Sequence, residues 1–407
     1  NLKLEGESSV KGQTTGNSSG GIFSMDLDAN SAWFEKYHLG SFQTRLSYKT
    51  GNLSFSKIKG IVLESNYSGE LNVDLLNKTI GASFESPVLD LANLQFVLSR
   101  IIKLPFQISG KGKAAAVIHG PLDFSHLSYT LDAQGNNVDI AGENFNTLAL
   151  KLNSKEGEVR TEKMELTKGN SVISLKGGAH PNGQMEAKIK GIGVRLEEIR
   201  LVEKINSAIT GLLDLEVEIN GHVLSPEVEI KSQIHDVVIE EEQIRDSFAN
   251  FTISQTKIEG EAKLFGNQLE TKVIWPFDKN SEFKLWTKAQ NWNYATLIGL
   301  IGGGTIRDEY MASISGVVDL SSQTGGISKA NGVIKIGKFY LKRGLQSLSN
   351  SKPIEVVFRD GQIDILQWLL VGEETQFKLE GKNFNLKNLD FTLNGQAELT
   401  LLHLFAP

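Results

Sequence analysis

The chain has 407 residues, a length that suits two or three domains or one long repetitive body. Its net charge is −6 with acidic and basic residues interleaved, which gives no electrostatic footprint for nucleic acid or for an anionic membrane surface. Cysteine is absent, which excludes disulfides, thiolate metal sites and cysteine nucleophiles. Forty glycines and only 8 prolines favour many short strands with frequent turns.

The chain opens on a segment, 1–10, with the pattern of a strand, and four related blocks follow. In each block apolar and polar residues alternate with period two, the signature of strands that have one apolar and one polar face. The blocks are 39–87, 145–191, 248–292 and 361–402. The last is the clearest and predicts four strands, and the third is the weakest match.

Glycines at equivalent places in the blocks give the period of the repeat. Gly51 and Gly157 are 106 residues apart, and Gly157 and Gly361 are 204 apart, about twice 102. The third block has Gln255 near this position. We expect these glycines in turns, and a second matching set in the next turn: Gly69, Gly177 and Gly381.

Each block leads into a segment with apolar residues at helical spacing. These predicted helices are 91–102, 196–209, a shorter 294–301, and one that begins at 399–405. A new series of strands opens after each of the first three. The sequence therefore predicts one continuous repetitive body with units at 1–104, 105–210, 211–310 and 311–407, each with six or seven strands and one helix, or roughly 25 strands in all.

Strands with one apolar face must cover that face. Roughly 25 such strands in one sheet would expose far more apolar surface than the few hundred Å² that a soluble monomer usually shows. Three architectures solve this: separate sandwiches, a sheet that curls so that its apolar face lines a groove, or a closed barrel. Tandem immunoglobulin-like sandwiches also repeat at about 100 residues, but a helix at every boundary and the lack of Pro- or Ser-rich linkers favour the groove. We therefore predict an all-β fold with a few short helices, built as an elongated, curled, open sheet.

The order of helix, hairpins and leucine-rich restart resembles the AsmA-like superfamily of repeating-β-groove lipid-transfer proteins. The passages that carry the resemblance are LTKGNSVISLKG and PIEVVFRDGQIDILQWLLVGEETQFKLEGKNFNLKNLDFTLNGQAELTLLHLFAP. The pattern covers essentially the whole chain, but it is one of apolar and glycine positions and has no catalytic signature.

The resemblance implies a periplasmic protein of a double-membraned bacterium, anchored in the inner membrane. Its groove would carry phospholipids between the inner and outer membranes, and an Omp85-type outer-membrane barrel would be its partner. A role in outer-membrane protein assembly is implied as well. Anchor and partner contacts would lie outside this chain, which we expect to be an excised fragment because it starts at Asn1 and stops at Pro407 where a repeat restarts.

The expected mechanism is physical. Moving a lipid chain into water costs about 0.8 kcal/mol per CH₂, and an apolar groove removes most of that barrier without a reaction. The residues that we expect to line the groove are apolar members of alternating strands: Leu148, Leu150, Leu152, Ile173, Leu175, Leu213, Leu215, Val217, Ile219, Val228, Ile230, Phe377, Leu379, Phe391 and Leu393. The alternative is an adhesin or scaffolding protein of tandem β-sandwiches without lipid cargo, in which the same residues form ordinary cores.

Other motifs give little support for a binding or catalytic site. Gly302, Gly303 and Gly304 follow a predicted helix instead of preceding one, so they do not predict a phosphate-binding loop. His119 and His126 are the nearest pair of histidines and are more simply solvated than metal-bound. The acidic run 240–242 is most simply a solvated loop. We expect no enzymatic activity, no cofactor and no metal.

Overall fold

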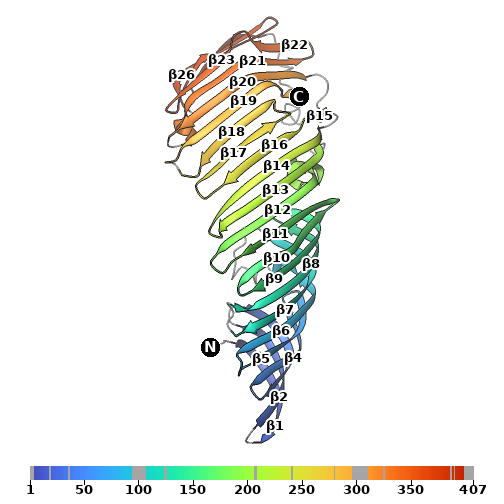
Figure 1. The fold of residues 1–407 in the computed structure, drawn as a ribbon. Coiled ribbons are helices and arrows are strands. Elements are labelled where there is room, and N and C mark those ends of the chain that lie inside the picture. The colour runs from blue at the N-terminus through green and yellow to red at the C-terminus, as the bar shows by residue number, and fades with distance from the viewer. Residues whose placement is uncertain are drawn as a thin grey trace. The chain divides into compact units, whose positions relative to one another are not determined.

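The computed structural model describes residues 4–17, 20–34, 37–93, 107–122, 126–205, 209–239, 242–278, 280–295, 310–323, 326–385, 387–388 and 390–397. Its 27 strands belong to one open antiparallel sheet that curls without closing into a barrel (Figure 1). The predicted fold class, an all-β protein with a curled open sheet, is confirmed. A tandem sandwich would instead pack separate sheets face to face.

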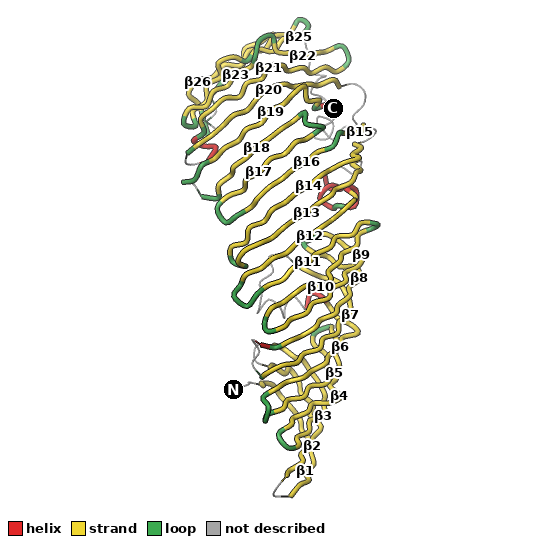
Figure 2. Tube along the Cα trace, viewed as in Figure 1, coloured by secondary structure: helices red, strands yellow, loops and turns green. Residues whose placement is uncertain are grey.

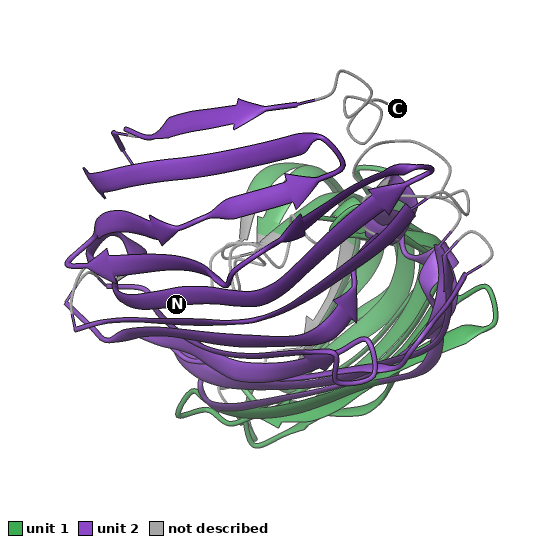
Figure 3. Ribbon diagram, turned by 90° about the horizontal axis from the view of Figure 1, so that it is seen from above, with its two compact units in different colours: residues 1–190 green, residues 191–407 purple. Residues whose placement is uncertain are grey.

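The chain divides into two compact units, residues 1–190 and 191–407, which Figure 3 shows in green and purple. Unit 1 is built of consecutive antiparallel hairpins. Its strands are β1 (Leu4–Asn17), β2 (Gly20–Phe34), β3 (Tyr37–Lys49), β4 (Asn52–Val62), β5 (Ser65–Asp74), β6 (Thr79–Asp90), β7 (Ile108–Pro121), β8 (Ser128–Ile140), β9 (Glu143–Lys155), β10 (Glu158–Lys168) and β11 (Ser171–Ala179). β12 (Gln184–Arg195) contains the boundary between the units.

The described residues of unit 2 form strands and three short helical segments, which Figure 2 distinguishes by colour. The helical segments are η2 (Leu196–Glu198), α2 (Arg200–Ile205) and η3 (Gly326–Lys329). The strands are β13 (Ile209–His222), β14 (Ser225–Ile239), β15 (Glu242–Ile244), β16 (Ser247–Ile253), β17 (Lys257–Leu264), β18 (Leu269–Pro276), β19 (Phe283–Asn293), β20 (Tyr310–Ser322), β21 (Asn331–Arg343), β22 (Gln346–Asn350), β23 (Ile354–Arg359), β24 (Gln362–Gln367), β25 (Leu369–Gly372), β26 (Thr375–Phe384) and β27 (Thr392–Gln396).

The first set of matching glycines lies in equivalent hairpin turns. Gly51, Gly157 and Gly361 have φ of 81°, 80° and 78°, and the residue before each also has positive φ. Two successive positive φ values define the type I′ turn, whose twist suits a two-residue hairpin. The turn therefore explains why glycine recurs at these positions.

The second set of glycines does not lie in turns, so that prediction was wrong. Gly69, Gly177 and Gly381 are inside β5, β11 and β26. A side chain there would collide with a neighbour, because a Cβ at Gly69 would lie 2.6 Å from the ring of Phe84 and one at Gly381 would lie 2.7 Å from the ring of Phe384. Glycine marks close packing within strands here, and sequence spacing alone does not separate that role from a turn.

A row of β-bulges crosses the strands of each unit. The pairing register shifts within nearly every long hairpin of unit 1, for example between Ala29 and Ala32 and between Phe55 and Ile58. Residues with left-handed φ mark the bulges: Ser31, Lys57 and Asn137 in unit 1, and Asp236 and Asn291 in unit 2. A bulge bends its strand and increases local twist. The row explains why the strands curve along their length in both units (Figure 3).

Side chains from a nearby strand accept the backbone amides of residues with left-handed φ. Asp214 Oδ1 accepts from the Gly193 amide at 2.7 Å, and Ser315 Oγ accepts from the Asn291 amide at 2.8 Å. Asn383, another residue with positive φ, donates its amide to Asp364 Oδ1 at 2.9 Å. These bonds pair backbone amides that the strand ladder leaves free at the bend.

The predicted helix at 196–209 is only partly right. It forms the short η2 and α2, separated by Ile199 in an extended conformation, and Ile209 already belongs to β13. The apolar spacing continued into a strand because both elements pack on the same cluster. Of the predicted helix at 91–102, residues 91–93 are helical and the rest lies outside the described residues. Most of 294–301, and all of 399–405, also lie outside them.

Candidate functional site

One face of the sheet in unit 2 is apolar over many strands. Residues directly opposite in an antiparallel pair share a face. Val217 lies opposite Ile230, which lies opposite Phe251, and the row continues through Gly260 to Val273 and Leu285. We call the surface that carries this row and its alternate neighbours the apolar face of unit 2. These side chains are mostly half-buried, not buried.

Six of the predicted lining residues meet on this face. Leu213, Leu215, Val217 and Ile219 alternate along β13, and Val228 and Ile230 lie opposite Ile219 and Val217 on β14. The intervening Asp214, Glu216 and Glu218 point to the other face, as the alternation predicts.

The predicted lining residues of unit 1 also share one face. Leu148 lies opposite Leu166, which lies opposite Ile173, and Leu150 lies opposite Met164, which lies opposite Leu175. Leu152 alternates with Leu150 on β9, opposite Leu131. Leu148 is buried and belongs to a cluster with Leu91 and Val138, while Leu150 and Leu175 are half-buried.

The last four predicted residues come from the clearest block. Leu379 on β26 lies opposite Leu393 on β27, and Phe377 lies opposite Gly395. Phe391 precedes β27, and its ring centroid is 6.4 Å from that of Phe384. Leu393 and Phe391 are 61% and 51% exposed.

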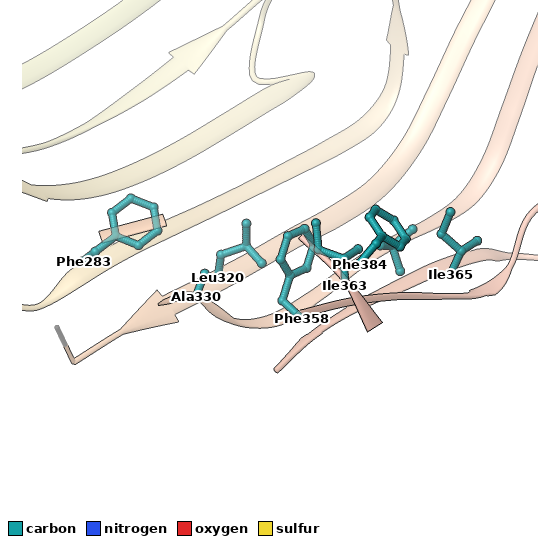
Figure 4. Packing of buried hydrophobic residues seen from close by; sticks show 8 residues of the cluster. Phe283, Leu320, Ala330, Phe358, Ile363, Ile365 and Phe384 are labelled. Carbon is teal, nitrogen blue, oxygen red and sulfur yellow. The ribbon is translucent and has the colours of Figure 1, made fainter. Parts of the chain in front are cut away.

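The apolar face of unit 2 is not uniform. One stretch of it is a dry cluster of buried side chains, seen in Figure 4: Phe283, Leu320, Ala330, Val356, Phe358, Ile363, Ile365 and Phe384. Phe283 and Ala330 are fully buried. Leu379 packs against this cluster, so it is closer to a core residue than Val217 or Ile230. The half-exposed stretch comprises β13, β14 and β16 to β18.

The helical segments among the described residues cover only a margin of the apolar face. Leu196 of η2 packs with Val237 and Ile239, and Ile199 and Val202 join them beside Leu213. All 27 strands lie in one sheet, so the described residues provide no second sheet over the rest of the face.

In both units the face opposite the apolar side chains carries charges in cross-strand pairs: Lys272 and Glu261 are such a pair in unit 2, with two further examples in unit 1. Arg45 Nε donates to Asp26 Oδ1 at 2.8 Å, and Lys151 Nζ lies 3.0 Å from Glu162 Oε2. The hydrogen bond from Arg45 lowers the pKa of Asp26, and that from Lys151 lowers the pKa of Glu162. Both pairs are exposed, so they identify the solvated face and contribute little to stability.

Open depressions lie on this charged face. One of about 760 Å³ in unit 1 is lined by Asp28, Gln43 and Lys59 among others, and one of about 560 Å³ in unit 2 by Glu259, Lys272 and Trp286 among others. Neither is enclosed by apolar side chains, so we place the candidate site on the apolar face instead.

A histidine joins two strands beside the bulges of unit 2. The Nδ1 atom of His235 is 3.0 Å from Asp236 Oδ2, and its Nε2 atom is 3.5 Å from Asp214 Oδ2. Asp214 also accepts the Gly193 amide, so the contact reaches β12. The hydrogen bond with Asp236, together with the charges of Asp214, Asp236 and Asp246, raises the pKa of His235 against the effect of burial.

The structure gives no support for a site at the remaining sequence motifs. In the part of the chain that the structure describes, no group of three or more His, Asp or Glu side chains is arranged to hold a metal ion. His119 lies on β7 and His126 lies two residues before β8. Glu240, Glu241 and Gly302 to Gly304 lie outside the described residues. No helix among the described residues is long and apolar enough to cross a membrane.

Several residues of the apolar face were not predicted from sequence. Phe251, Ile258 and Val273 lie on it, in the block with the weakest match. In that block the turn after Ile253 has no glycine, because the Ser254 side chain accepts the amides of Thr256 and Lys257 at 3.3 Å. Serine at the start of a turn was the signal that could have fixed the register.

Comparison of the chain with models of protein families, with curated proteins and with solved structures finds no match.

Proposed function

We propose that the apolar faces of the two units bind the acyl chains of phospholipids, and that the protein conducts phospholipid between the inner and outer membranes without catalysing a reaction. The observation that supports this is the half-exposed apolar surface of β13, β14 and β16 to β18, which lies in a single open sheet. Soluble proteins rarely leave so broad an apolar surface without a ligand.

The free energies of acyl-chain transfer favour transport of lipid over its long-term storage on the protein. Each CH₂ that stays out of water is worth about 0.8 kcal/mol, so an apolar strip removes most of the barrier to moving a chain between bilayers. Because a bilayer offers the same environment, net binding is weak and chains move either way. The charged face remains in water and keeps the protein soluble.

The sequence resemblance supports the cellular setting. Within the AsmA-like superfamily the pattern is most similar to TamB, the translocation and assembly module subunit. On this basis we propose a periplasmic location, an inner-membrane anchor outside this chain, and a TamA- or BamA-like Omp85 barrel as partner. A part in outer-membrane protein assembly belongs to the same proposal.

Lipid extraction tests the binding step directly. Protein purified from bacterial cells without detergent is extracted with organic solvent, and phospholipids are quantified by mass spectrometry against a soluble control protein from the same cells. We expect phospholipid in at least equimolar amount. If correctly folded protein carries no phospholipid, the result would instead favour the adhesin or scaffolding role.

A further inference from the structure

Three successive turns of unit 2 lie at the same ends of the strands, and exposed apolar residues lie at the first and the third of them. The turns are 222–226 between β13 and β14, 254–257 between β16 and β17, and 275–278 at the end of β18; we call them the rim. Leu224 is 79% exposed, Phe277 55% and Trp275 48%. Figure 2 shows these turns in green along the left-hand side of unit 2.

Hydrogen bonds join the three turns. Gln255 Nε2 donates to the Leu224 carbonyl at 2.6 Å, and the Phe277 amide donates to the Thr256 carbonyl at 2.8 Å. The turns that carry Leu224 and Phe277 are therefore both tied to the polar turn between them, 254–257. Turn positions usually carry polar residues or glycine, so the large exposed side chains of Leu224 and Phe277 require an explanation.

The rim is continuous with the apolar face. Trp275 lies opposite Ile258 on that face, and its ring meets Phe283 edge to face at 5.5 Å between centroids. From Trp275 the apolar surface passes outward to Phe277 and inward to Val273. An acyl chain that entered at the rim would stay on apolar surface.

We infer that the rim inserts into the interface of a phospholipid bilayer and passes acyl chains sideways onto the apolar face of unit 2. This inference rests on the proposed function. Exposed Leu224 and Phe277 on their turns, with Trp275 near the end of β18, suit insertion to shallow depth, and tryptophan favours the boundary between headgroups and hydrocarbon.

The charges of the rim identify the kind of bilayer. Lys257 and Asp278 are the charged residues of the three turns, and their charges cancel. Lys257 is paired with Glu259, and Asp278 accepts the Asn280 amide. With no excess positive charge to attract anionic lipid, the rim should bind a zwitterionic bilayer.

Single cysteines test insertion cleanly, because the chain has none of its own. Leu224→Cys and Phe277→Cys are labelled with an environment-sensitive dye and mixed with phosphatidylcholine vesicles. Leu345→Cys is the matched control, since Leu345 is 89% exposed on a turn at the opposite ends of the strands. We expect a blue shift at the two rim positions and none at the control.

A second variant separates the rim from the face. Leu224→Ser combined with Phe277→Ser should lower vesicle co-flotation about tenfold or more, because two large apolar side chains no longer enter the bilayer. The same variant should still bind dihexanoyl phosphatidylcholine below its micelle concentration, since a monomeric lipid needs no docking.

The outcomes distinguish the two proposals. If the dyes at the two rim positions show no blue shift, or if Leu345→Cys shows an equal shift, the rim inference is overturned even if monomeric lipid binds. A protein partner would then be the better occupant of the rim. Rim dyes that respond while the protein binds no monomeric lipid would uphold bilayer docking and overturn acyl-chain binding by the face.

Discussion

Val217 on β13 lies directly opposite Ile230 on β14, and both side chains are half-buried. Val356 on β23 is the same residue type on the same face, but it is only 7% exposed and lies within the dry cluster. The pair Val217 and Val356 therefore offers a matched comparison of an open and a closed part of one surface.

Val217→Asp should lose most of the bound phospholipid while lowering the free energy of unfolding by about 1 kcal/mol, because the carboxylate can remain hydrated. Val356→Asp should lower it by about 3 kcal/mol or more, because its charge is buried among apolar side chains. Lipid content by mass spectrometry and urea unfolding measure the two effects. Equal destabilisation by both changes would mean that β13 is covered.

Gly361→Ala should destabilise unit 2 by about 2 kcal/mol, since φ is 78° and the new Cβ would lie 2.1 Å from the Ser328 carbonyl oxygen. Gly193→Ala is the control, with φ of 60° and open space around the Cβ position. It should cost about 1 kcal/mol, the strain of left-handed backbone alone. Urea denaturation compares them, and an equal loss would refute the role of the Ser328 contact.

His235 should make the stability of unit 2 depend on pH. Its folded pKa is raised by Asp236 and Asp214, so its contribution is complete below the unfolded pKa of about 6.5 and is lost as pH rises through the folded value. Unfolding midpoints measured from pH 6 to pH 9 should fall across this window. His235→Gln should remove that part of the fall; an unchanged profile in the variant would contradict the assignment.

The phenol of Tyr67 should lose its proton only at unusually high pH. Burial raises the pKa of its phenol to about 12, and its hydroxyl donates to the Leu39 carbonyl at 2.8 Å. Above pH of about 10 the unfolded phenol ionises while the folded one stays neutral, so stability falls as pH rises. Tyr67→Phe should weaken that fall and cost about 1 kcal/mol at neutral pH. Ultraviolet difference spectra follow the phenol, and early ionisation would show that the residue is exposed.

Period-two alternation predicted which side chains of β13 and β14 lie on the apolar face. The alternation specifies the register strongly, because a slip of one residue would move every apolar side chain to the other face. The turn glycines were predictable for the same local reason, since a type I′ turn requires positive φ at Gly51, Gly157 and Gly361. Local sequence did not show that Leu379 packs against a dry cluster while Val217 does not, because that difference depends on distant residues such as Phe283 and Phe358.

The helix at 196–209 failed for a related reason. Apolar residues at helical spacing also fit a short helical turn followed by a strand that packs on the same cluster. The rim was also missed, since a single exposed leucine or phenylalanine in a turn carries no signal. The pairing of β13 to β18, together with the hydrogen bonds between the turns, brings Leu224 and Phe277 to one side of the sheet.

The bulges have a consequence for how such a chain can evolve. Left-handed residues such as Lys57, Asn137 and Asp236 recur from hairpin to hairpin, so the bend is encoded within individual hairpins and needs no distant contact. A duplicated or deleted hairpin would carry its own bend with it, leaving the cross-section of the sheet unchanged. The number of hairpins and the bend of each hairpin can therefore change independently during evolution.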